Sequence, residues 1–165
     1  MHAEAGSWRS EAVAAHPLAE LLACPTETGS LLNQAAQAMD FLAGETVFRQ
    51  MGICRGLYVI VAGRFLRKAE RMEARLTLGT ARSGDLVELA AALGSHFHTY
   101  TLSAQTAGSV MLLPMEAMER AFESYPPLRM QLLGELAREV SRAYNVCCLD
   151  RLLPPRRRSV GVAQA

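Results

Sequence analysis

The sequence predicts a mainly β protein with flanking helices: a double-stranded β-helix (jelly roll) followed by a long C-terminal helix. Between residues 39 and 114, short apolar runs rich in β-branched and aromatic residues alternate with turns. Gly44 and Gly63 stand where the chain must reverse, and glycine tolerates the positive φ angles of such turns. After Pro114 the composition changes to helix-forming residues. The two regions together indicate one β-roll with a helical appendage.

The N-terminal region reads as an arm followed by two short helical pieces. Residues 1–16 are rich in Ala and Ser and show no period, which indicates an arm. Residues 17–23 are predicted as a short helix that Pro25 and Gly29 end. A second helical piece is predicted over residues 31–38, just before the first strand.

Eight short strands are expected after this helix. They cover residues 39–42, 46–49, 56–61, 63–68, 74–78, 85–88, 99–104 and 108–113. The charged segment 67–75 lies between two of these strands and is predicted to be a solvated hairpin. A jelly roll of eight strands limits exposed edges by closing two sheets on each other.

The C-terminal part of the chain predicts a short helix over 115–124 and a long one from Pro127 to about residue 152. The long helix carries one apolar stripe, which consists of Leu132, Leu136, Val140, Ala143 and Cys147. A helix of about 25 residues is nearly 40 Å long, which is longer than a small barrel. Part of the helix is therefore expected to pack on its own roll, and its far half to pair with a second subunit. The predicted segments are 1–30 for the arm and short helix, 31–125 for the roll, 126–153 for the dimerisation helix and 154–165 for a basic tail.

Composition excludes several classes of protein. The 165 residues are half apolar and carry a formal net charge of +1, so no strong field favours nucleic acid. No apolar run is long enough to span a membrane, and the N-terminus lacks the apolar stretch of a signal peptide. The four cysteines show no framework spacing and are expected to be reduced thiols. These features predict a cytoplasmic protein.

The segment 41–65 resembles the opening of the cyclic-nucleotide-binding domain in the catabolite-activator and fumarate-nitrate-regulator (Crp/Fnr) superfamily. The matching features are the Gly44-Glu45 turn, the Phe48-Arg49-Gln50 strand end, and the strand 57–61 that closes at Gly63. The resemblance covers about residues 30–150. It implies an effector-sensing domain of a transcriptional regulator, with a dimer helix at its C-terminal end.

The resemblance also bears on partners. Members of the superfamily usually carry a helix-turn-helix after the dimer helix, whereas here Pro154-Pro155 and a short basic tail follow. We therefore expect no sequence-specific DNA binding by this chain. It is expected to act as a homodimer, or as a heterodimer with a full-length regulator, in response to an unidentified small-molecule effector.

In nucleotide-binding members of the superfamily, a late cassette supplies a Glu for the ribose, backbone amides, and an Arg-Ser or Arg-Thr pair for the cyclic phosphate. By resemblance the candidate pocket residues here are Gly84, Glu88, Leu89, Ala90, His98 and Thr99. Glu88 matches the ribose Glu if one residue is deleted after Asp85, and otherwise replaces a Gly. His98 stands in the place of the Arg, and Thr99 takes the Ser/Thr place.

Phosphate recognition is the weak point of this cassette. No Lys or Arg occurs between Ser83 and Glu119, and a neutral His is a poor substitute for the permanently charged fork of Arg. Tight binding of cyclic nucleotides is therefore not expected, and His98→Arg is expected to strengthen any weak binding. The alternative is a genuine cyclic AMP or cyclic GMP receptor that uses a remote cation such as Arg64 or Arg82.

Cofactor and enzyme functions are not expected. Cys24 is far in sequence from Cys147-Cys148, so a four-thiolate iron–sulfur cluster is not predicted; haem, which needs only one His, is not excluded by counting. A second alternative is a small cupin-like metalloenzyme that uses His96 and His98 on one strand face. Two histidines do not complete a typical metal site, so the segment 96–98 is predicted to be a solvated loop.

Overall fold

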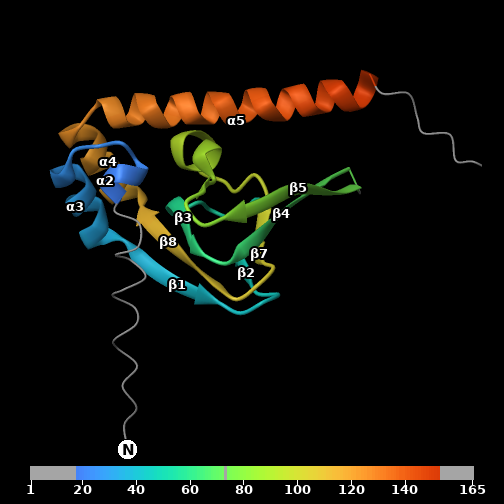
Figure 1. Ribbon diagram of the computed structural model, residues 1–165, viewed down its shortest axis with the longest axis horizontal. Coiled ribbons are helices and arrows are strands. Elements are labelled where there is room, and N and C mark those ends of the chain that lie inside the picture. Colours follow the sequence, from blue (N-terminus) through green and yellow to red (C-terminus); the bar gives the residue numbers. More distant parts are fainter. Residues whose placement is uncertain (1–17, 73, 153–165) are drawn as a thin grey trace, which may run out of the picture.

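The structure is a computed structural model that describes residues 18–72 and 74–152, with side chains of the last helix as far as residue 145. Two short helices, α2 (Leu18–Leu21) and α3 (Thr26–Ala35), come first, and α4 (Met115–Ser124) and α5 (Pro127–Leu152) come last. The strands between them are β1 (Gln37–Phe41), β2 (Thr46–Phe48), β3 (Gly56–Ala62), β4 (Arg64–Arg71), β5 (Ala74–Arg82), β6 (Leu86–Val87), β7 (Thr101–Ala104) and β8 (Gly108–Pro114). A single π-helical turn, η1 (Ala91–Ser95), separates β6 from β7. Figure 1 shows the short helices at one end of the roll and α5 running across one side of it.

The eight strands form two four-stranded antiparallel sheets, in the orders β1-β8-β3-β6 and β2-β7-β4-β5. The core lies between them: Leu57, Phe65, Leu102 and Leu113 are all fully buried. Phe65 of the second sheet also meets Phe41 of the first edge to face, with ring centroids 6.2 Å apart. The predicted jelly roll is therefore confirmed.

The predicted turns and the charged hairpin are also confirmed. Gly44 and Gly63 have φ angles of +90° and +86°, in the region that glycine adopts without steric cost. Strands β4 and β5 pair antiparallel as far as Arg71 and Ala74, as expected for a hairpin in this part of the chain. All eight predicted strands exist, although β7 begins two residues later than predicted and β5 extends four residues further.

The predicted bounds of the second helical piece, 31–38, are wrong. Helix α3 begins at Thr26, directly after Pro25, and ends at Ala35, so residues 37 and 38 already belong to β1. Gly29 lies inside this helix instead of ending the previous one. A Cβ at Gly29 would lie 2.6 Å from the Cβ of Ala19, so the glycine permits α2 and α3 to pack closely.

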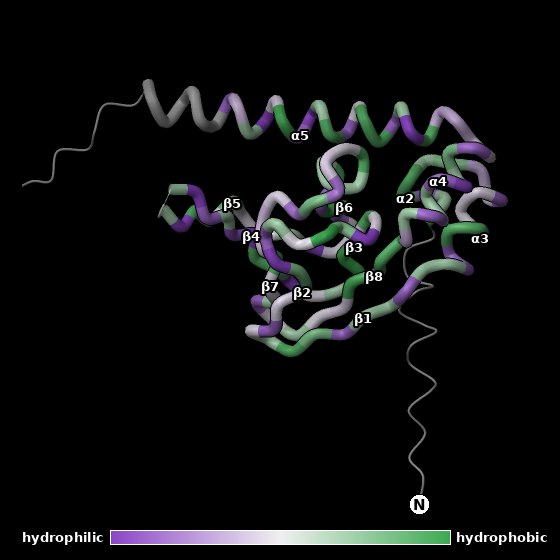
Figure 2. Tube along the Cα trace, turned by 180° about the vertical axis from the view of Figure 1, so that it is seen from behind, coloured by the Kyte–Doolittle hydropathy of each residue, from purple (hydrophilic) through white to green (hydrophobic). Residues whose placement is uncertain are grey.

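Helix α5 divides lengthwise into a face that packs on its own chain and a face that does not. Leu128 and Leu132 are buried in the core, and Leu136 is partly buried against it. On the other side, Met130, Leu133, Val140 and Tyr144 are exposed by 68, 38, 59 and 68 %. Figure 2 shows hydrophobic and hydrophilic residues alternating along the coloured part of α5. No helix in the described part of the chain is both long and apolar enough to span a membrane.

This division corrects the apolar stripe expected from the sequence. Leu132 and Leu136 do not point outward, because they anchor the first half of α5 to the roll. Val140 and Ala143 are exposed, and Cys147 lies beyond the described side chains. The exposed face follows Met130, Leu133, Ala137, Val140 and Tyr144, at alternating spacings of three and four residues. That spacing is typical of a coiled-coil seam.

Candidate ligand site

The candidate site is built around Glu88, which connects β6 to η1. Its φ of +68° is unusual for a residue with a side chain, and it is 3 % exposed. Both of its carboxylate oxygens lie 3.2 Å from the N–H of Thr99, and Oε1 also accepts a bond from the Thr99 hydroxyl at 3.0 Å. The N–H of Glu88 donates to the hydroxyl oxygen of Tyr100 at 3.1 Å. The two Thr99 donors therefore already face a carboxylate of the same chain.

His98 lies beside this carboxylate in an aromatic environment. Its ring stacks on Phe48 at a centroid distance of 3.8 Å with an interplanar angle of 5°, and Tyr58 lies 5.6 Å away. Its Nδ1 is 3.5 Å from Oε2 of Glu88 and has no hydrogen-bond partner among the described residues.

The prediction of a solvated loop at 96–98 is therefore wrong, since His98 is 2 % exposed. Its backbone bonds to residues of the β2–β3 connection, N–H to Gly52 and C=O from Met51, both at 2.8 Å. These bonds hold the segment against the roll and turn the His98 ring inward.

Burial shifts the protonation of both groups towards their neutral forms. It lowers the pKa of His98 from 6.5 to about 4, because the charged imidazolium loses its hydration. Burial also raises the pKa of Glu88, although the hydrogen bonds from Thr99 oppose the shift. His98 is thus neutral near pH 7 and supplies no positive charge to the site.

We expect His98 to destabilise the protein as the pH falls from about 6.5 to about 4. In this interval the unfolded chain binds a proton at His98 that the folded chain does not, so the free energy of unfolding decreases. Glu88 acts with the opposite sign, because its raised pKa lets the folded state keep a proton that the unfolded state has lost. Urea titrations at several pH values should show a smaller decrease for His98→Phe than for the wild type. Equal decreases would contradict the buried, neutral His98.

The other predicted site residues do not lie with Glu88, His98 and Thr99. Leu89 is buried in the core, Ala90 is exposed, and Gly84 lies in the turn before β6 with a φ of +88°. Of the six residues, the structure brings together Glu88, His98 and Thr99. Arg64 and Arg82, the remote cations considered for phosphate, are exposed and face each other across β4 and β5.

The shared metal site of His96 and His98 is not formed. The two residues do not alternate on a strand, because His96 adopts a left-handed conformation with φ of +60° and ends η1. His96 is exposed whereas His98 is buried. Within the described ranges, no group of three or more His, Cys, Asp or Glu side chains is placed to hold a metal.

Arg67 was not predicted as a site residue. It connects the surroundings of Glu88, His98 and Thr99 to α5. Its guanidinium carbon lies 6.0 Å from the centroid of the Tyr100 ring, and its Nη1 pairs with Oε1 of Glu139 at 3.1 Å. Its Nε is buried without a hydrogen-bond partner in the described part of the chain. Arg67 lay in a segment predicted to be solvated, and only the long-range packing of α5 over the roll shows that it points inward.

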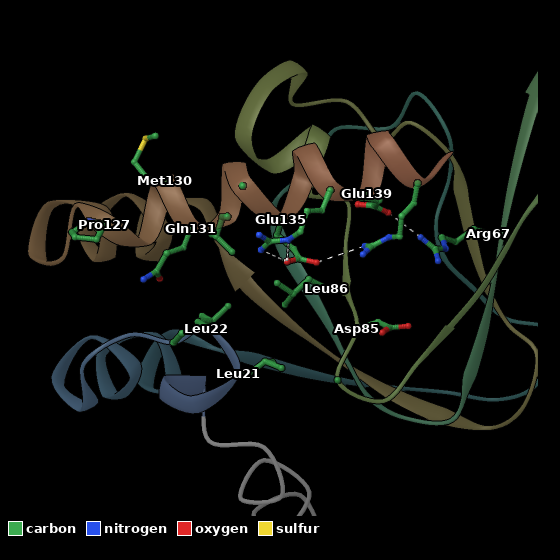
Figure 3. Close-up of a pocket in the computed structure, with 16 residues that line it drawn as sticks. Leu21, Leu22, Arg67, Asp85, Leu86, Pro127, Met130, Gln131, Glu135 and Glu139 are labelled. Carbon is green, nitrogen blue, oxygen red and sulfur yellow. Dashed lines mark hydrogen bonds and ion pairs between the residues drawn. The ribbon is translucent and has the colours of Figure 1, made fainter. Parts of the chain in front are cut away.

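A cavity of about 800 Å³ lies between α5, α2 and the turn before β6. Figure 3 shows Leu21, Leu22 and Gln131 at one end, with Arg67 and Glu139 pointing towards each other at the other. The lining also includes Asp85, Glu135, Arg138 and Arg142, so its charges balance. Glu135 pairs with Arg138 at 2.6 Å and with Arg142 at 3.6 Å. The cavity therefore has an apolar end and an end occupied by ion pairs.

We expect the Arg67–Glu139 pair to contribute measurably to the attachment of α5. A double-mutant cycle with Arg67→Met and Glu139→Gln should give a coupling of about 1 kcal/mol in the free energy of unfolding, since both side chains are partly buried. The exposed pair of Arg75 and Glu70 is the matched control, and its coupling should be near zero. Equal couplings for the two pairs would show that Arg67 does not hold α5.

Comparisons with known proteins agree with this architecture. The sensor domain of the transcriptional regulator DNR from Pseudomonas aeruginosa superposes with a TM-score of 0.66 at 17 % identity, over 84 % of this chain and 92 % of that one. The Thermus thermophilus catabolite activator protein gives 0.69 at 19 %, over 81 % and 62 %. The regulatory domain of Toxoplasma gondii PKA, crystallised with cAMP, gives 0.67 at 16 %, over 79 % and 50 %. At these identities the likeness shows the fold.

The family follows from the sequence match. A comparison with curated protein sequences gives no significant match. The model of the cyclic nucleotide-binding domain, however, matches residues 38–125, which is more than half of the 165 residues. The match spans the roll from β1 to the end of α4, including Glu88 and His98. The chain belongs to the cyclic nucleotide-binding domain family.

Proposed function

We propose that this protein is the effector-sensing and dimerisation domain of a Crp/Fnr-type transcriptional regulator, and that it does not bind cyclic nucleotides tightly. The observation that carries this proposal is the position of the Glu88 carboxylate on the two Thr99 donors. By resemblance, Thr99 stands where a nucleotide-binding relative holds the cyclic phosphate. A carboxylate of the chain itself therefore occupies the donors that a phosphate would need.

The electrostatics of the site support the same conclusion. A phosphate entering beside Glu88 would bring a second negative charge into a buried environment, which is costly unless a cation compensates it. His98 is neutral near pH 7, and no Lys or Arg lies between Ser83 and Glu119. The nearby Arg67 is already paired with Glu139.

The cavity between α5 and the roll is the space that we assign to the effector. About 800 Å³ is enough for a small organic molecule, and the cavity touches both the roll and the helix. An effector at its charged end would compete for Arg67 or Glu139, and so change how firmly α5 is held. This route would carry a signal from the roll to the helix.

The exposed face of α5 supports dimerisation. We define the outer seam as Met130, Leu133, Ala137, Val140 and Tyr144, whose spacing matches the contact positions of a two-stranded coiled coil. A second copy of this chain, or the dimer helix of a full-length regulator, would cover it. In either case we place the assembly in the cytoplasm.

Titration calorimetry with cyclic AMP and cyclic GMP tests the proposal. We expect dissociation constants no tighter than about 1 mM, near −4 kcal/mol. A constant in the low micromolar range would reject the proposal and favour the alternative of a genuine nucleotide receptor. The family match favours that alternative, but the Glu88–Thr99 contacts oppose it.

A further inference from the structure

An exposed apolar surface lies on the outer side of the segment that holds His98. We define the 51/53/97 patch as Met51, Ile53 and Phe97, which are exposed by 72, 74 and 49 %. Ile53 and Phe97 face each other in an antiparallel β-bridge, so their side chains are neighbours. None of the three lines the cavity, and none belongs to α5.

The backbone under the patch is well defined. The N–H of Cys54 donates to the carbonyl of His96, and the N–H of Met51 donates to that of His98, both at 2.8 Å. Met51 also has a φ of +67°, which is uncommon for a residue with a side chain. The patch is thus built on paired backbone, and its apolar side chains are exposed and do not belong to the core.

The surroundings of the patch are basic. The two segments that supply it, residues 46–69 and 89–115, contain no Asp or Glu. Arg49, Arg55 and His96 are exposed within two residues of the patch in sequence. Glu70 approaches through its backbone, which bonds to the Gln50 side chain, but its carboxylate pairs with Arg75. An occupant that complements this surface carries both apolar and acidic side chains.

We propose that the 51/53/97 patch is a docking surface for an acidic amphipathic segment of a partner protein. Three apolar side chains with the two exposed Arg residues beside them are enough for a small peptide contact whose energy is concentrated in a few anchors. They fall short of the clusters of four to eight Lys or Arg that hold proteins to anionic membranes. A second copy of this chain would meet the same basic rim and be repelled. The surface is distinct from the proposed effector cavity and from the outer seam.

The test uses two synthetic 16-residue amphipathic peptides, with Leu on one helical face and either Glu or Lys on the other. In the full chain with ¹³C-methyl-labelled methionines, the Glu peptide should shift the Met51 signal and leave that of Met130 unchanged. Met130 is the reference signal because it lies on α5, in the outer seam and outside the patch. We expect a dissociation constant on the order of 10⁻⁵ M that weakens as salt increases. The Lys peptide should not bind.

Variants make the assignment specific. Ile53→Ser and Phe97→Ser should each weaken the Glu peptide by at least about tenfold, whereas Leu42→Ser, which changes an equally exposed residue outside the patch, should not. Arg49→Glu with Arg55→Glu should transfer the preference to the Lys peptide. Absence of binding, equal binding of both peptides, or an equal loss in Leu42→Ser would overturn the proposal. Binding to phosphatidylserine vesicles that is tighter than binding to the Glu peptide would overturn the proposal in favour of a membrane. A mass of Phe97→Ser below that of the wild type, measured by light scattering, would overturn it in favour of a second copy.

Discussion

The double variant Glu88→Gln, His98→Arg is expected to bind cyclic AMP about 100-fold more tightly than the wild type. Glu88→Gln removes the competing charge from the Thr99 donors, and the new guanidinium supplies a permanent partner for the phosphate. Hydrogen bonds to charged groups contribute about 1.5–3 kcal/mol each, which sets this scale. Titration calorimetry measures the change, with thermal unfolding to confirm that the variant folds.

The single variants separate the two effects. His98→Arg alone should not strengthen cyclic AMP binding. Nδ1 of His98 lies 3.5 Å from Oε2 of Glu88, so a guanidinium at residue 98 would pair with the Glu88 carboxylate. The sequence suggested the opposite, since it does not show that Glu88 and His98 are neighbours. Glu88→Gln alone should strengthen binding by roughly tenfold. A large gain in His98→Arg alone would mean that Glu88 does not control the site.

Charges in the outer seam are expected to convert a dimer into monomers. Leu133→Glu and Val140→Glu each place a carboxylate at the centre of the seam, where it would lose hydration without a partner. Both side chains are exposed in the single chain, so the fold should persist. Light scattering at micromolar concentration measures the mass, and circular dichroism checks the helix.

The control for this experiment lies on the same helix. Asn145 is exposed but stands outside the seam spacing, so Asn145→Glu should remain dimeric. Leu136→Glu is a poor probe of assembly, because Leu136 packs partly on its own core and its replacement would loosen α5 from the roll. A wild-type protein that is already monomeric would contradict the dimer.

The fold was largely predictable because its signals are local. Gly44 and Gly63 adopt the positive φ angles that their turns demand, and the buried strand 57–61 is a continuous apolar run. Each signal acts over a few residues and does not depend on distant packing. The role of Gly29 was predicted wrongly because it depends on packing between two helices. It looks like a helix end in sequence, but its role is a close contact with Ala19 of another helix.

The site was predictable only in part. The resemblance identified Glu88, His98 and Thr99, but not their arrangement, because Glu88 turns inward through a left-handed conformation that its residue type does not suggest. The burial of His98 depends on backbone pairing with Met51 and Gly52, far away in the chain. Such long-range pairings leave no periodic pattern in the sequence.

Which residues of α5 face outward could not be predicted from the sequence for the same reason. Helical periodicity shows which residues share a stripe, but both sides of this helix carry apolar residues at regular spacing. Only the position of the roll decides that Leu132 lies inside and Leu133 outside. Arg67 was missed for a similar reason, since its partner Glu139 is 72 residues away.

The most direct test of the central claim is the amide signal of Thr99 in ¹H–¹⁵N NMR spectra of the wild type and Glu88→Gln. If the Glu88 carboxylate accepts the Thr99 N–H, the wild-type signal should move with pH as Glu88 titrates, at a pKa above the usual 4.5. In Glu88→Gln the signal should not titrate in this way. Micromolar cyclic AMP should leave the wild-type signal in place. A Thr99 signal that ignores pH but shifts with micromolar cyclic AMP would contradict the account.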